Sequence, residues 1–248
     1  MIYEEFFCIL KSFCYLCTVK KLDIMRIKIN FNGSNTEYKK NSLHQVKGWF
    51  ENNVLGRNND KHNDASYYSL SPMLGGIRTA EGEKFPNGGY VYFTTNSDEF
   101  MSKVAMALFN MNNSVAVGDL AYKNFEMSKD FHIHSDYDIV RTVSPILLKS
   151  NHKKITIKDD GFLPLLRERS VEKLVANGMD KAKADTLSIE LFHKENAQVI
   201  DMQYNGIHNF ATKAMFIVKG HRQAREALYN MGIGSSTGCG FGTVSVND

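Results

Sequence analysis

Five glycines are concentrated near the end of the chain, in the run MGIGSSTGCGFGTVSV at 231–246. Glycine lets a ligand approach the main chain closely, and consecutive N–H groups can bind anions such as phosphate. Hydroxyl side chains in the same run can bond phosphate or ribose oxygens. The candidate ligand-binding residues are Gly232, Gly234, Ser235, Ser236, Thr237, Gly238, Gly240 and Gly242.

The order of elements around this run excludes two common phosphate-binding motifs. A dinucleotide-binding loop needs a strand, then glycines, then a helix that receives the phosphate. Here an amphipathic helical pattern precedes the glycines and a strand pattern follows them. A Walker loop needs Gly-Lys-Ser/Thr, and the run contains no lysine. Two interpretations stay open: a bare backbone that faces a large ligand, or a turn that fixes how the helix packs against the strand.

Composition places the chain among ordinary globular proteins. Its 248 residues are 43% hydrophobic and 23% charged, which suits one large domain or two of about 100 residues. The net charge of +3 does not by itself indicate a nucleic-acid partner. Cys14 and Cys17 form a single C-x-x-C pair, and no second pair completes a zinc site. No metal and no cofactor are therefore expected.

Residues 1–24 differ from the rest of the sequence. Glu4 and Glu5 occupy the place of the positive start of a signal peptide, and Lys11 interrupts the apolar run. From Met25 onward, apolar and polar residues alternate at strand period. We expect 1–24 to be an extension outside the fold, and we expect a cytoplasmic protein with no membrane association.

The hydrophobic period predicts alternating strands and helices in the first half. Strand patterns lie at 25–31, 65–71, 88–96 and 138–148, and helical patterns lie at 43–55 and after Ser97. The order strand, helix, strand, strand, helix, strand is the ferredoxin-like unit.

The second half repeats this order loosely if 138–148 also opens a second unit. A helical region at 162–192, broken near Gly178, precedes strands at 199–204 and 213–219, a helix at 221–231 and a strand at 241–246. We predict an α+β fold of two tandem ferredoxin-like (βαββαβ) domains at 25–135 and 136–248.

Three segments together carry a family resemblance. The glycine-rich run, Val143-Ser144-Pro145-Ile146 and Tyr67-Tyr68-Ser69-Leu70-Ser71-Pro72 resemble motifs of the repeat-processing endoribonucleases among CRISPR-associated proteins. These enzymes are the sixth-numbered Cas family of the RAMP superfamily. The resemblance covers about 25–246 and implies the same fold of two tandem ferredoxin-like domains.

The resemblance also implies an activity and partners. It implies metal-independent cleavage of CRISPR precursor RNA within its repeats, which leaves 2′,3′-cyclic phosphate and 5′-OH ends. The implied partner is CRISPR repeat RNA, and a homodimer or a CRISPR effector complex is compatible with the family. The alternative is a RAMP-type subunit that binds guide RNA without cutting it.

Candidate catalytic residues follow from this resemblance. His62 lies where the family commonly places its catalytic histidine, in a polar loop before the Tyr-Ser strand, and His44 is the second choice. Histidine suits proton transfer because its unperturbed pKa is about 6.5. Lys61 and Lys47 are candidates for stabilising negative charge on the phosphate. Some relatives carry a tyrosine on the first helix, and this helix has none. Tyr67 or Tyr68 could replace it, and Tyr68 is the candidate that we choose.

Two further basic residues are candidate contacts to the RNA backbone. Arg141 and Lys213 lie on strands that we predict for the second domain. The period of a strand does not say which of its faces is covered.

Overall fold

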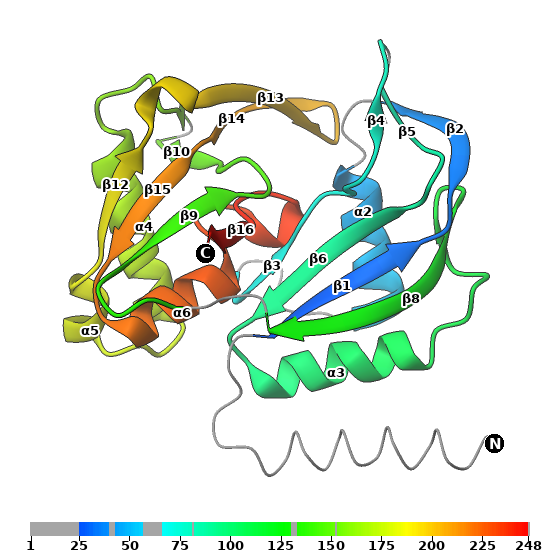
Figure 1. Cartoon of the computed structure of the whole chain (residues 1–248), viewed down its shortest axis with the longest axis horizontal. Helices are drawn as coiled ribbons and strands as arrows, with labels where there is room; N and C mark the ends of the chain where they lie inside the picture. The colour runs from blue at the N-terminus through cyan, green and yellow to red at the C-terminus, as the bar shows by residue number, and fades with distance from the viewer. Residues whose placement is uncertain are drawn as a thin grey trace.

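The computed structural model describes residues 25–39, 43–56, 66–80, 82–129, 133–151 and 153–247. Two units lie side by side, each with its own sheet and helices (Figure 1). Within these ranges no helix is both long enough and apolar enough to cross a membrane.

The N-terminal unit is built on a five-stranded sheet in the order β3-β6-β1-β8-β7. Its chain order is β1-α2-β3-β6-α3-β8, which together with the strand order is the ferredoxin-like arrangement. The elements are β1 (Met25–Phe31), α2 (Leu43–Phe50), β3 (Tyr68–Leu70), β6 (Gly89–Thr95), α3 (Asp98–Phe109), β7 (Ala116–Val117) and β8 (Leu120–Lys129).

The C-terminal unit repeats the plan with a four-stranded sheet in the order β12-β15-β9-β16. Both sheets place the second, third, first and fourth strands of their unit side by side, so the prediction of two tandem ferredoxin-like folds is confirmed. The elements are β9 (Tyr137–Thr142), α4 (Phe162–Ala176), α5 (Lys181–Asp185), β12 (Ser188–Phe192), β15 (Met215–Lys219), α6 (Arg222–Met231) and β16 (Val244–Asn247).

Three predicted elements were assigned wrongly. The fourth strand of the first unit is β8, whereas the 138–148 segment opens the second unit as β9 and leaves the strand after Thr142. β12 lies inside the region predicted to be helical. The 199–204 strand belongs to a hairpin outside the main sheet, formed by β13 (Gln198–Tyr204) and β14 (Ile207–Lys213).

The hairpin forms because its turn and its pairing are both local. Asn205 and Gly206 have φ of 48° and 76°, and this left-handed pair is the preferred two-residue hairpin turn. Seven residues of β13 pair in register with β14, so their main-chain groups are satisfied without the neighbouring sheet.

Short elements complete the fold. A three-stranded sheet of β2, β5 and β4 lies beside the N-terminal unit, and β10 and β11 form a small hairpin. Their bounds are β2 (Ser34–Lys39), β4 (Ile77–Arg78), β5 (Gly82–Phe85), β10 (Leu148–Ser150) and β11 (Lys153–Ile155). The short helices are the π-helical turn η1 (Glu51–Leu55) and the 3-10 turns η2 (Lys194–Asn196) and η3 (Thr237–Cys239).

Local sequence explains the elements that position the site. Ile27, Ile29 and Phe31 alternate along β1 and are buried. Phe31 meets Trp49 of α2 with ring centroids 5.1 Å apart, which holds that helix against the sheet. A small third cluster of Leu43, Leu147, Met202, Ala211 and Phe241 joins the cores of the two units.

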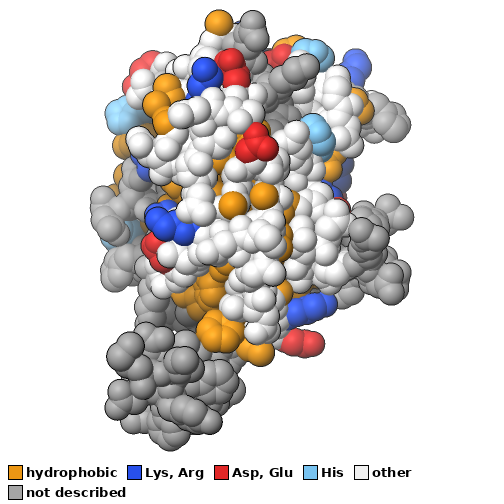
Figure 2. All heavy atoms as spheres, turned by 90° about the vertical axis from the view of Figure 1, so that its right-hand side faces the viewer, with side chains coloured by type: hydrophobic (Ala, Val, Ile, Leu, Met, Phe, Trp, Pro, Cys, Tyr) orange, Lys and Arg blue, Asp and Glu red, His pale blue; other side chains and the backbone are white. Residues whose placement is uncertain are grey.

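The outer face of the N-terminal unit carries mixed charge. Figure 2 shows Lys and Arg side chains lying singly on this face, next to acidic and uncharged groups. Among the described atoms of this view there is no continuous basic patch.

Candidate nucleic-acid interface and catalytic cluster

The glycine-rich run turns the chain from α6 into β16. It folds back on itself because Ile233 N donates to Gly242 O at 2.9 Å. Four of its glycines have positive φ, a conformation that side chains with a Cβ rarely adopt. η3 forms the middle of the run, where Cys239 N donates to Ser236 O at 2.8 Å.

The three sequence segments that carry the family resemblance meet at this run. Gly242 N donates to Pro145 O at 3.0 Å, and Thr243 N donates to Ser144 Oγ at 2.9 Å. From the other unit, Ser69 Oγ lies 2.8 Å from Thr243 Oγ1. The run therefore joins the second unit to strand β3 of the first.

The glycines are buried against protein atoms. A Cβ on Gly238 would lie 2.8 Å from the Tyr68 hydroxyl, and one on Gly240 would lie 2.6 Å from Leu43. One on Gly242 would lie 1.9 Å from Ile233 O. All five glycines are buried, so the expectation of bare backbone open to a ligand is wrong for Gly232, Gly234, Gly238, Gly240 and Gly242. The alternative interpretation, a turn that fixes packing, accounts for them.

The hydroxyl residues of the run divide into two groups. Thr237 has 0% exposure, and its hydroxyl donates to Tyr68 O at 3.0 Å, so this side chain has no surface for a ligand. Ser235 and Ser236 are partly exposed. Contact between the run and RNA stays a prediction, and these two serines have the surface to make it.

Two predicted catalytic residues, Lys47 and Tyr68, come together beside the run. Lys47 Nζ donates to Cys239 Sγ at 3.1 Å and lies 3.4 Å from Glu51 Oε1. Burial disfavours the Lys47 charge, but the interactions with Cys239 and Glu51 outweigh it and raise the pKa of Lys47. Burial raises the pKa of Tyr68 to about 12, and the nearby Lys47 charge opposes this shift. At neutral pH the Lys47 side chain is thus a cation and the Tyr68 side chain is a protonated phenol.

The two other candidates, His62 and Lys61, lie outside the described residues. The segments that flank them in sequence end at Gly56, after η1, and resume at Ser66, before β3. Ser66 lies beside the run, because a Cβ on Gly238 would be 3.1 Å from its hydroxyl. The second-choice histidine, His44, is exposed on α2.

Arg141 and Lys213 are both exposed on strands of the C-terminal unit. In the sheet Arg141 pairs with Met215, and Met215 follows Lys213 by two residues in the sequence. Lys213 lines a cavity of about 600 Å³ between the two units, together with Leu43, Met73 and Met202. Both basic groups are thus available to a polyanion, and their role in binding RNA stays a prediction.

Sequence reasoning missed several polar residues of this region. Glu51 and Cys239 contact Lys47, and Lys173 contacts the run. No catalytic or binding motif in the sequence marks these three residues. Lys173 gave one usable signal, because it falls in the helical spacing Phe162, Leu166, Ser170 that marks the buried face of α4.

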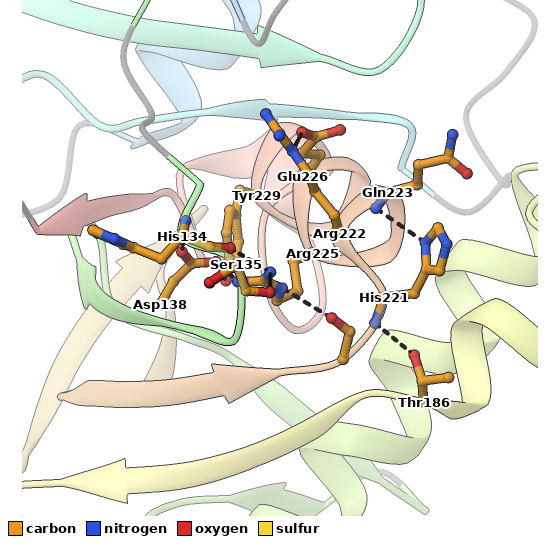
Figure 3. Close-up of polar contacts among 11 residues, drawn as sticks. His134, Ser135, Asp138, Thr186, His221, Arg222, Gln223, Arg225, Glu226 and Tyr229 are labelled. Atoms are coloured by element: carbon orange, nitrogen blue, oxygen red, sulfur yellow. Dashed lines mark hydrogen bonds and ion pairs between the residues drawn. The ribbon is translucent and has the colours of Figure 1, made fainter.

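A buried ion pair fixes the start of the second unit. Figure 3 shows Asp138 of β9 and Arg225 and Tyr229 of α6 pointing toward one another. Arg225 Nη1 and the Tyr229 hydroxyl donate to Asp138 Oδ2 at 2.5 and 2.9 Å. Arg225 Nη2 also donates to His134 O and Ser135 O, so this pair holds the chain that enters β9.

Metal ligands do not gather in the part of the chain that the structure describes. No group of three or more His, Cys, Asp or Glu side chains is arranged there to hold an ion.

Comparison with known proteins assigns the family. The family model described as "CRISPR associated protein Cas6, C-terminal" matches residues 123–246, half of the chain. The chain belongs to the Cas6 family. As a Cas6 protein it has a role in processing or binding CRISPR RNA. No curated protein sequence matches this Cas6 chain.

Solved structures share the fold of this Cas6 chain. A Cas6-related protein from Pyrococcus furiosus superposes with a TM-score of 0.74 at 18% identity, covering 91% of this chain and 99% of that one. A structure described as a RAMP protein binding different RNA substrates has a TM-score of 0.75 at 16% identity, covering 90% and 100%. A Cas6 product complex has a TM-score of 0.64 at 12% identity, covering 91% and 99%.

Proposed function

We propose that this Cas6 protein is a metal-independent endoribonuclease that cuts CRISPR precursor RNA within its repeats. The observation that carries the proposal is the meeting of Lys47 and Tyr68 with the glycine-rich run in a chain of this family. The similar structure of a product complex supports the same activity.

The reaction needs no external nucleophile. The 2′-oxygen next to the scissile phosphate attacks phosphorus, and the bond from phosphorus to the 5′-oxygen breaks. One proton leaves the 2′-hydroxyl and one reaches the departing 5′-oxygen, so the products are a 2′,3′-cyclic phosphate and a 5′-OH. The protein must supply proton transfer and positive charge near the phosphate.

We assign these roles to His62, Lys47, Lys61 and Tyr68. His62 transfers protons, because an imidazole titrates near working pH. His62 lies four positions before Ser66 in the sequence, and four steps of the chain span at most about 14 Å. Lys47, which carries its charge at neutral pH, stabilises the phosphorane, and Lys61 adds a second cation. Tyr68 keeps its proton at neutral pH, so it acts as a hydrogen-bond donor and not as a base.

We further propose that repeat RNA contacts Ser235, Ser236, Lys213 and Arg141, the exposed or half-exposed members of the predicted binding set. The protein would work in the cytoplasm on its RNA, as a homodimer or within an effector complex. Light scattering of the purified protein with and without RNA measures the first of these assemblies.

The test is cleavage of repeat RNA in EDTA by wild type and His62→Ala. We expect wild type to give a 2′,3′-cyclic phosphate product, and we expect His62→Ala to bind RNA with unchanged affinity and to cut at least 100-fold more slowly. Undiminished cleavage by His62→Ala removes that residue from the mechanism.

A second function has support from one similar structure, the RAMP protein that binds different RNA substrates. This chain would then bind guide RNA without cutting it. Salt-dependent RNA binding with no cleavage by wild type, in EDTA or with Mg²⁺, would favour this alternative.

A further inference from the structure

Lys173 is a lysine inside the core of the C-terminal unit. It lies on the buried face of α4, with Phe162, Leu166 and Leu174, and has 9% exposure. Among the described residues no Asp or Glu forms an ion pair with it. A buried ammonium without a carboxylate partner is costly, and an apolar side chain of similar size would avoid the cost.

The Lys173 ammonium contacts the glycine-rich run at two points. Nζ donates to Gly232 O at 3.0 Å and to Thr237 Oγ1 at 3.4 Å. Gly232 directly follows the last residue of α6. Carbonyl groups at the end of a helix lack partners within the helix, and they favour a positive charge there. The single Lys173 side chain therefore donates hydrogen bonds to the Gly232 carbonyl at the end of α6 and to the Thr237 hydroxyl at the start of η3.

The contact continues into the other unit through Thr237. The Thr237 hydroxyl has one hydrogen, which it donates to Tyr68 O at 3.0 Å. It must then accept from Lys173, since a hydroxyl donates once. The result is a directed chain from Lys173 of α4 through Thr237 of η3 to Tyr68 of β3.

We propose that Lys173 is a positioning residue that holds the glycine-rich run against β3 and thereby keeps Cys239 and Tyr68 beside Lys47. This role rests on the proposed function for its effect on cleavage. Its effect on the run itself is independent of that function. Lys173 is buried beneath the run and does not touch the RNA.

The test compares Lys173→Met with Ser170→Ala. Met has a similar length and no donor. Ser170 lies on the same buried face, but its hydroxyl donates to Leu166 O of its own helix, so Ser170→Ala is a matched control. Hydrogen exchange of the amides at 232–243 is measured by mass spectrometry, together with the single-turnover cleavage rate and the dissociation constant for repeat RNA.

We expect Lys173→Met to raise exchange in 232–243 at least tenfold and to lower the cleavage rate at least tenfold, with RNA affinity within threefold of wild type. Ser170→Ala should change none of these. Unchanged exchange in folded Lys173→Met overturns the inference, as does equal loss of affinity and rate. If wild type does not cut RNA, the proposed function fails, and the exchange measurement alone then tests whether Lys173 positions the run.

Thr237→Val provides a second route if Lys173→Met does not fold. Valine keeps the shape of threonine and removes the link between Lys173 and Tyr68. We expect faster exchange in the run, and protection equal to that of wild type would contradict the proposal.

Discussion

The side-chain nitrogen of Lys47 lies 3.1 Å from the sulfur of Cys239, so a helix of the first unit and the glycine-rich run of the second meet through one hydrogen bond. These residues are 192 positions apart in the sequence. The contact between Lys47 and Cys239 is thus formed only when both units are folded and joined.

Removal of the Lys47 charge should slow cleavage much more than it weakens RNA binding. A cation that stabilises charge developing in the transition state commonly contributes about 100-fold in rate. We expect Lys47→Met to lower the single-turnover rate by about that factor, with RNA affinity within threefold of wild type. Lys181→Met, which removes an exposed lysine of α5, should cut at the wild-type rate. Equal rates for the two variants would contradict the role of Lys47.

Gly242→Ala should destabilise the protein by about 3 kcal/mol or more, because the new Cβ adds both a collision and backbone strain. The Cβ would lie 1.9 Å from Ile233 O, and φ is +64°. Two controls separate these effects. Gly178 has φ of +86° and open space, so Gly178→Ala should cost about 1 kcal/mol, and Gly161→Ala, with open space and φ of −78°, should cost less than about 0.5 kcal/mol. Urea denaturation measures all three.

Asp138→Ala should destabilise the protein by about 3–5 kcal/mol, because it leaves the buried Arg225 charge without its partner. Both side chains have 0% exposure. Replacing only the exposed partner of Lys219, in Glu190→Ala, should cost less than about 1 kcal/mol. Thermal unfolding compares the two variants, and similar losses would mean that the buried pair is not an anchor.

Stability should depend on pH through Lys173. Burial lowers the pKa of Lys173 from 10.5 to about 7. Below pH 7 both folded and unfolded chains carry the proton and the full cost of burial is present. Between about 7 and 10.5 only the unfolded chain holds it, so this cost falls as pH rises.

The measurement is the free energy of unfolding of wild type minus that of Lys173→Met, at pH 6 to 9. The difference should be constant below pH 7 and then shift in favour of wild type by up to about 1.4 kcal/mol per pH unit. A difference that does not change with pH would show that Lys173 keeps an ordinary pKa.

The sequence predicted those parts of the fold in which pattern and packing agree. β1 and α3 were found because Ile27 and Ile29 alternate and because Ser97 caps the helix, accepting from Phe100 N at 3.2 Å. β12 was missed because it is five residues long and follows two helices. The 199–204 strand was placed in the sheet because strand period does not specify the partner strand, and its actual partner, β14, was not predicted.

The candidate site was also predicted only in part, because a residue pattern does not specify spatial neighbours. Lys47 was chosen as a cation on the first helix, and Tyr68 was chosen to replace a tyrosine that some relatives carry. The structure places both beside the same glycine-rich run. The glycines were expected to face a ligand, but they face Tyr68, Leu43 and Ile233. A sequence shows where a Cβ is absent and not which atoms occupy the vacant space.

The contacts between the two units join residues that are synthesised at very different times. Lys47 and Tyr68 leave the ribosome early, whereas Thr237, Cys239 and Thr243 follow every strand of both sheets except β16. A nascent or prematurely ended chain therefore contains the residues of the first unit but lacks the segment that contacts Lys47 and Tyr68. If the protein cuts RNA as proposed, such a chain would carry Lys47 and Tyr68 without their contacts to Cys239 and Thr237, and we expect it to cut RNA more slowly than the 248-residue chain.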